Sequence, residues 1–144
     1  MAVILASSCL LGCECRYKGD GCKCDALIKL AESNTIIGVC PEQMGGLPTP
    51  RDPAERQGDK VISCASKDVT KAYTKGAETA LYFAKLNHVD FAVMKAKSPS
   101  CGKGLIYDGT FTGNKIPGNG VTVELLNANG IPVFTEDELD QLPL

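Results

Sequence analysis

The chain has 144 residues, a length typical of a single domain, and 44% of them are hydrophobic, which is enough to form a core. Its formal net charge of −2 gives no electrostatic reason to expect a nucleic acid or an anionic membrane as a partner. No apolar run approaches the roughly 20 residues of a membrane-spanning helix. No basic residue precedes the apolar N-terminal segment as it would in a signal peptide. We therefore expect one cytoplasmic domain over residues 1–144.

Strand and helix signals alternate along the first part of the chain. Residues 2–8 form a continuous apolar run, which predicts a strand buried on both faces. Apolar residues then recur at helical spacing over 26–33, where Asp25 can cap the helix. Residues 35–40 predict a second buried strand, and the proline- and glycine-rich segment 41–56 predicts a long loop. Long loops in compact domains are more often functional than idle.

The rest of the chain continues this alternation and adds one hairpin. Residues 69–87 predict a long helix with a single apolar stripe, capped by Asp68 or Thr70. The remaining predicted elements, in chain order, are a short strand pair or edge segment at 59–66, a strand at 90–97, a hairpin at 104–118 with Asp108-Gly109 as its turn signal, a helix at 120–130 closed by Gly130, a strand at 131–136 and a short helix at 136–142. This order predicts an α/β fold: a Rossmann-like three-layer domain with a mostly parallel sheet and a small β-hairpin.

Three of the eight cysteines are placed at the ends of predicted strands. Cys9 ends the first strand, Cys40 ends the second, and Cys101 lies four residues beyond the third. The carboxyl ends of parallel strands share one edge of the sheet, where open α/β sheets bind their ligands. We therefore expect these three thiols, which are far apart in the sequence, to converge in space.

Three converging thiolates are compatible with several kinds of site. With a fourth ligand they form a closed zinc site. They also hold an iron–sulfur cluster in which one iron lacks a protein ligand. Such an open iron can bind substrate as a Lewis acid, whereas a cluster held by four cysteines carries electrons. The simplest alternative is that the cysteines are small buried hydrophobic residues.

The segment "CECRYKGDGCKC" contains two further cysteine pairs, Cys13 with Cys15 and Cys22 with Cys24. Zinc sites more often use C-x₂₋₄-C spacing, so the pattern leaves open a second metal site, disulfides or unpaired surface thiols. Cys64 is expected to be structural. Cytosolic thiols are kept reduced, which favours metal binding or catalysis over disulfides for the chain as a whole.

Polar residues accompany the three strand-end cysteines. Glu42 follows Cys40 by two residues, and a carboxylate beside a metal can move protons, although a solvated loop glutamate explains it equally well. The hydroxyls of Ser98 and Ser100 can donate to a cluster sulfur or a substrate atom, or they serve ordinary turn chemistry. His88, the only histidine, falls at a helix end, where we expect a capping or surface role.

Several motifs resemble, in order, the family of small bacterial proteins that includes thiouracil desulfurase. The resemblance covers roughly residues 3–138. Its motifs read "SSCLLG", "CRYKG", "VCPEQMGGLPTPR", "DVTKAYTKGA", "KAKSPSCGKGLIYDGTFTG", "GNGVTVELL" and "GIPVF" in this chain. The third and fifth motifs of this set, around Cys40 and Cys101, are too specific to be expected together by chance.

The resemblance implies an enzyme with an oxygen-sensitive [4Fe–4S] cluster, which purification in air can remove. Its ligands would be Cys9, Cys40 and Cys101. The implied reaction removes sulfur from a thiolated pyrimidine or a related small thioamide by hydrolysis without net redox change. Glu42 and one serine, Ser100 in preference to Ser98, would be the catalytic residues that handle protons.

A second class of function stays open at this point. The chain could be a non-enzymatic metal- or sulfur-binding module, with zinc or an iron–sulfur cluster in a structural or sensing role. The cysteine-rich segment 13–24 departs from the family pattern, and it leaves open an extra metal site or a ligand role for Cys15. The sequence specifies neither the natural substrate nor the oligomeric state.

Overall fold

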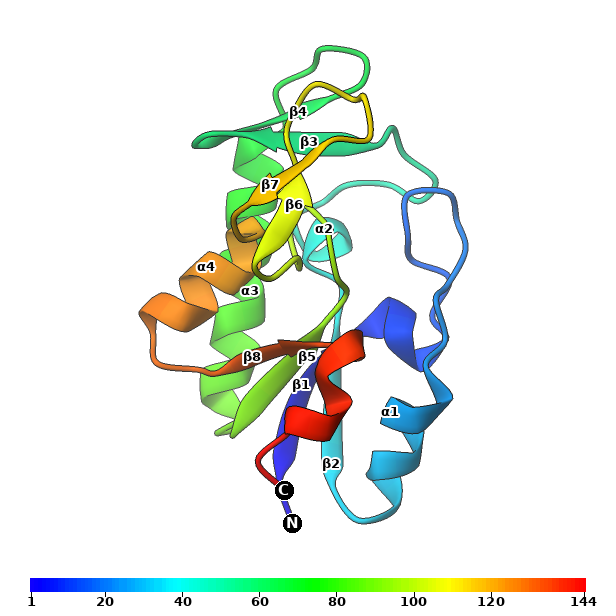
Figure 1. The fold of residues 1–144 in the computed structure, drawn as a ribbon, viewed down its shortest axis with the longest axis vertical. Coiled ribbons are helices and arrows are strands. Elements are labelled where there is room, and N and C mark those ends of the chain that lie inside the picture. The colour runs from blue at the N-terminus through cyan, green and yellow to red at the C-terminus, as the bar shows by residue number, and fades with distance from the viewer.

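The computed structural model describes residues 1–144 and contains a four-stranded sheet in which every pairing is parallel (Figure 1). The strand order is β2-β1-β5-β8, so β1 and β5 occupy its interior. The strands span Val3–Ser7 (β1), Thr35–Val39 (β2), Phe91–Met94 (β5) and Val133–Thr135 (β8). The predicted α/β class with a mostly parallel sheet is therefore confirmed.

Helices cover both faces of this sheet. They are α1 (Asp25–Lys29), α2 (Pro41–Met44), α3 (Thr70–Leu86) and α4 (Val121–Ala128), with 3₁₀ turns η1 (Ser8–Leu11), η2 (Leu30–Glu32) and η3 (Glu136–Gln141). Helix α3 is the longest, at 17 residues. No helix combines the length and the apolar character needed to cross a membrane.

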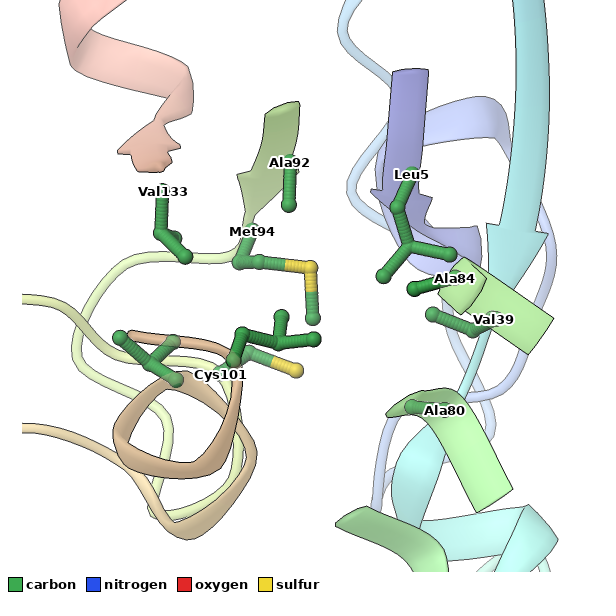
Figure 2. Close-up of a cluster of buried hydrophobic side chains, with 10 residues drawn as sticks. Leu5, Val39, Ala80, Ala84, Ala92, Met94, Cys101 and Val133 are labelled. Atoms are coloured by element: carbon green, nitrogen blue, oxygen red, sulfur yellow. The ribbon is translucent and has the colours of Figure 1, made fainter. Parts of the chain in front are cut away.

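Alternation of side chains along the strands divides the core into two layers. On one face, Leu5 of β1 packs with Ala80 of α3 and Leu126 of α4, and all three are fully buried (Figure 2). On the other face, Ile4 of β1 packs with Leu27 of α1. The three-layer arrangement predicted from the sequence follows from this division.

Two antiparallel hairpins lie beyond the ends of the sheet strands (Figure 1). They comprise β3 (Ala54–Gln57) with β4 (Lys60–Ser63), and β6 (Leu105–Tyr107) with β7 (Lys115–Pro117). The second is the small hairpin predicted from the sequence. Its strands are joined by the segment 108–114, which is longer than a tight Asp-Gly turn.

Three local expectations were wrong. Strand β2 is partly exposed instead of buried on both faces, because it is an edge strand that pairs only with β1. Segment 41–56 is not a loop throughout, since α2 begins it and β3 occupies its end. Pro41 at the first helical position favours that start of α2. The expected helix caps differ as well: the residue at the cap position is Cys24 in α1, not Asp25, and Val69 in α3, not Asp68 or Thr70.

Helices α2 and α3 approach each other backbone to backbone through two glycines. A Cβ added to Gly76 of α3 would overlap the carbonyl oxygen of Pro41, and one added to Gly45 at the end of α2 would overlap that of Ala72. Each glycine therefore makes room for the other helix. This contact fixes α2, and with it the side chain of Glu42, against the longest helix of the domain.

We predict that Gly76→Ala lowers the free energy of unfolding by about 1–2 kcal/mol. The added methyl group overlaps the backbone of Pro41 and must push α2 away from α3. Overpacking of this kind costs up to about 3 kcal/mol, which exceeds the roughly 1 kcal/mol that alanine gains over glycine in helix propensity. Urea unfolding followed by circular dichroism measures the change. Lys75→Ala, at an exposed neighbour on α3, is the control and should change stability by less than about 0.5 kcal/mol. Equal stability of the two variants would contradict the packing argument.

Candidate active site

A cavity of about 520 Å³ opens at the carboxyl ends of β1, β2 and β5. All six site residues predicted from the sequence line it: Cys9, Cys40, Glu42, Ser98, Ser100 and Cys101. The topological argument from strand ends is therefore consistent with the structure, in which these residues line one cavity. The same cavity is also lined by Cys15, Arg16, Tyr17, Arg51, Glu55, Tyr73, Lys95, Tyr107 and Phe111, among others.

The three strand-end thiols reach the cavity from three different elements. Cys9 lies in η1, directly after β1; Cys40 lies between β2 and α2; Cys101 lies in the loop between β5 and β6. Cys9 and Cys101 are buried, Cys40 is half-buried, and all three are free thiols. No three His, Cys, Asp or Glu side chains are grouped tightly enough to hold a single metal ion, so the thiols surround the cavity without meeting at one point.

Backbone hydrogen bonds to α4 hold the loop that carries Cys101. The amide groups of Val121 and Thr122, at the start of α4, donate to the carbonyl oxygens of Pro99 and Ser100, each at 2.9 Å. Cys101 itself packs into the apolar layer between the sheet and this helix (Figure 2). The loop is therefore a fixed part of the core, even though it has no regular secondary structure.

Burial controls how readily these thiols ionise. It raises the pKa of the Cys9 thiol to about 11 and that of the Cys101 thiol to about 12. Cys40 differs, because a hydrogen bond with the Cys15 thiol lowers its pKa. Buried thiols form thiolates when a metal or cation compensates the charge. A set of three such thiols around one cavity fits an iron–sulfur cluster, whose usual ligands are Cys thiolates.

The carboxylate of Glu42 is held from two sides. Arg51 Nε donates to Glu42 Oε1 at 3.0 Å, and Ser100 Oγ donates to Glu42 Oε2 at 3.0 Å. The Arg51 and Glu42 side chains are only 7% and 15% exposed. Arg51 Nη2 also donates to the carbonyl oxygen of Cys15 at 2.9 Å. The alternative interpretation of Glu42 as a solvated loop residue is therefore wrong.

The two serines of the Cys101 loop make different contacts. Ser98 Oγ accepts hydrogen bonds from the amides of Ser100 and Cys101, at 3.2 and 3.1 Å, which is ordinary turn chemistry. Ser100 Oγ lies 3.4 Å from Cys101 Sγ and also contacts Glu42. Ser100 thus connects the carboxylate to a thiol. The Ser98 hydroxyl contacts the Ser100 hydroxyl, with 3.0 Å between the two Oγ atoms.

Sequence reasoning missed Arg51 and Tyr73, the polar residues of this cavity that lie next to Glu42. Burial raises the pKa of the Tyr73 hydroxyl, which lies near Glu42, so this hydroxyl remains protonated. The clearest signal for Arg51 was its place in the proline-rich segment directly after Glu42. Cys15, whose role was left open, is buried and lines the cavity. The carbonyl oxygen of Cys15 lies 3.7 Å from Cys40 Sγ.

The remaining cysteines lie outside the cavity lining. Cys13 is exposed, Cys22 and Cys24 are half-buried, and all eight cysteines of the chain are free. Cys64 is exposed next to β4 and belongs to neither buried cluster. His88 is exposed just after α3 and does not line the cavity.

The model of the 2-thiouracil desulfurase family matches residues 4–138 of this chain. The chain belongs to this family. It is 41% identical to the uncharacterized protein YbbK of Bacillus subtilis (strain 168) over 150 aligned residues, which cover 97% of this chain and 99% of YbbK. It is 44% identical to the [4Fe-4S]-dependent thiouracil desulfidase TudS (DUF523Vcz), whose solved structure matches with a TM-score of 0.94. That match covers 99% of this chain and 95% of TudS. Both the family and the fold predicted from the sequence are confirmed.

We predict that Arg51→Gln lowers the free energy of unfolding by about 2–4 kcal/mol. Removing one partner of a largely buried ion pair leaves the other charge uncompensated, which is the costly way to break such a pair. Chemical denaturation of the metal-free protein measures the loss. The double variant Arg51→Gln/Glu42→Gln should recover part of it, because the unpaired carboxylate is then gone.

Arg16→Gln is the matched control, since Arg16 lines the same cavity. Its ion pair with Asp20 is longer, at 3.6 Å, and more exposed, so its loss should cost less than about 1 kcal/mol. An Arg51→Gln variant as stable as this control would contradict the proposed importance of the Arg51–Glu42 pair.

Proposed function

We propose that this protein is a [4Fe–4S]-dependent desulfurase that removes sulfur from a thiolated pyrimidine or a related small thioamide by hydrolysis without net redox change. One observation carries the proposal: three free cysteine thiols and a hydrogen-bonded Glu42–Ser100 pair line the same cavity. The family membership and the similarity to TudS support it. The cavity volume of about 520 Å³ suits a small heterocycle.

The ligands in this proposal are Cys9, Cys40 and Cys101. When bound, the cluster supplies a Lewis-acidic iron that can polarise the thiocarbonyl group of a substrate. Cys40 enters as the thiol that ionises most readily, whereas Cys9 and Cys101 require the metal to stabilise their thiolates. Free thiols and an oxygen-sensitive cofactor are suited to a reducing compartment such as the cytoplasm, where we place the protein.

Glu42 and Ser100 handle the protons of the reaction. Exchange of C=S for C=O consumes one water and releases hydrogen sulfide or hydrosulfide, so the attacking water must lose protons and the departing sulfur must receive one. Glu42 Oε2 accepts a proton, either directly or through the Ser100 hydroxyl that already donates to it. Arg51 occupies Oε1 and so leaves Oε2 as the oxygen that faces the serine.

Cys15 supports one competing function. It lines the cavity beside Cys40 and so offers a fourth thiol. A cluster held by four cysteines has no open iron for substrate, as expected of an electron-transfer or structural module. The two functions differ in whether Cys15 is needed for the cluster.

We predict that Cys101→Ser abolishes stable cluster assembly, whereas Cys15→Ser and the exposed control Cys64→Ser retain it. The first removes a proposed ligand, and the other two do not. Anaerobic reconstitution, followed by iron and sulfide analysis and the broad visible absorbance, measures the content. Wild-type protein prepared in air should contain less of both elements.

Full iron and sulfide content in Cys101→Ser would contradict the ligand assignment. Loss of the cluster in Cys15→Ser as well as in Cys101→Ser, with Cys64→Ser and the wild type loaded, would favour the closed four-cysteine module over the desulfurase.

We predict that Glu42→Gln keeps the cluster but lowers the rate of desulfuration by about 10²–10⁴-fold, the typical contribution of a positioned acid–base group. Glutamine has nearly the same shape and still accepts the Ser100 hydrogen bond, but it cannot take up the proton. Hydrosulfide release from 2-thiouracil under nitrogen, normalised to iron content, measures the rate. Glu78→Gln, at an exposed position on α3, is the control and should match the wild type. A Glu42→Gln variant that turns over at the wild-type rate would contradict the role.

A further inference from the structure

The cavity has an aromatic side chain at its rim for which the fold gives no packing reason. Phe111 lies in the segment 108–114 between β6 and β7, lines the cavity, and is 38% exposed. Its backbone φ is +58°. Large side chains rarely adopt this left-handed conformation, which persists only where the surroundings impose it. Neither the proposed cluster ligands nor the proton-handling residues account for it.

Hydrogen bonds from the neighbouring hairpin impose this conformation. Glu55 Oε1, on β3, accepts hydrogen bonds from the amides of Gly109 and Phe111, at 3.0 and 3.2 Å. Gln57 Nε2, also on β3, donates to the carbonyl oxygen of Gly109 at 2.9 Å. Within the segment, Asp108 Oδ1 accepts from the amide of Thr110 at 2.9 Å. Hydrogen bonds from β3 and within the segment therefore fix its backbone, and this holds the Phe111 ring in a defined position.

The ring of Phe111 differs from the other aromatic rings of the cavity. Tyr73 is buried. Tyr17 and Tyr107 each have a lysine Nζ over the ring, at 5.8 Å for Lys18 and 5.3 Å for Lys115 from the ring centroids. Phe111 is paired with neither a cation nor another aromatic ring. Its face is therefore available to a ligand.

We propose that Phe111 is a specificity-determining residue, whose ring stacks on the planar ring of the heterocyclic substrate and orients its thiocarbonyl group toward the three thiols. This inference rests on the proposed function for the identity of the substrate. Stacking suits a thiolated pyrimidine, because a planar heterocycle of this type presents a π face to an aromatic side chain. The planar group of an acyclic thioamide is much smaller than a heterocyclic ring and stacks less well, so the residue selects rings over chains.

Kinetics of two substitutions separate the ring from the backbone. Phe111→Ala and Phe111→Gly both remove the ring, but only glycine adopts a positive φ without strain. If the ring binds substrate, both variants raise the KM for 2-thiouracil about tenfold, in keeping with the usual loss on removing a base-stacking aromatic. Ile116→Ala is the matched control: Ile116 is on the same hairpin, is 43% exposed and does not line the cavity, so its KM stays at the wild-type value. Recovery of the wild-type KM in Phe111→Gly alone would overturn the proposal, since Phe111 would then act only through the loop.

A binding measurement tests the contact without relying on turnover. The chain has no tryptophan, so Phe111→Trp introduces the only tryptophan, at the rim, and Ile116→Trp places the only one elsewhere on the hairpin. In cluster-loaded protein we expect 2-thiouracil and uracil to quench the first variant saturably and to leave the second unchanged. Quenching of neither variant, with wild-type protein that releases sulfide from 2-thiouracil, overturns the role of Phe111 and leaves the proposed function intact. Saturable quenching of Phe111→Trp without sulfide release by loaded wild-type protein supports the contact and overturns the desulfurase activity.

Discussion

Parallel pairing of β1 with β2 and β5 is the constraint on which the candidate site depends. Because all three strands run the same way, the residues that follow them lie along one edge, and Cys9, Cys40 and Cys101 reach a common cavity. Nothing in their local sequence would bring them together, since they are 31 and 61 residues apart along the chain. The helices and the two hairpins then complete the walls of this cavity.

Arg51 connects the parts of this cavity that the sheet does not fix. Its guanidinium group contacts Glu42 of α2, the carbonyl oxygen of Cys15 and, through Nη1, Thr49 Oγ1 at 2.9 Å. One buried cation therefore joins the segment after β1 to the segment after β2. Arginine suits this task better than lysine because its fixed fork of donors satisfies several acceptors at once.

Topological rules were sufficient for the thiols and insufficient for the rim of the cavity. Cys9, Cys40 and Cys101 do line one cavity as expected, because strand direction alone decides which strand ends share an edge. Phe111 was not, because its position depends on hydrogen bonds to Glu55, 56 residues away in the sequence, which leave no periodic or local signal. The wrong expectation for β2 has a related cause: an apolar run does not distinguish an edge strand from an interior one.

Cys101 is part of both the candidate site and the apolar core. It is a proposed ligand, and it is also a member of the apolar cluster that contains Leu5, Met94 and Val133 (Figure 2). Any group that binds this thiol in the folded state, but not in the unfolded chain, shifts the folding equilibrium by mass action. With Cys101 as a ligand, occupancy of the cavity and stability of the core would be thermodynamically linked through one side chain. The metal-free chain would then be the less stable form and the one more open to proteolysis.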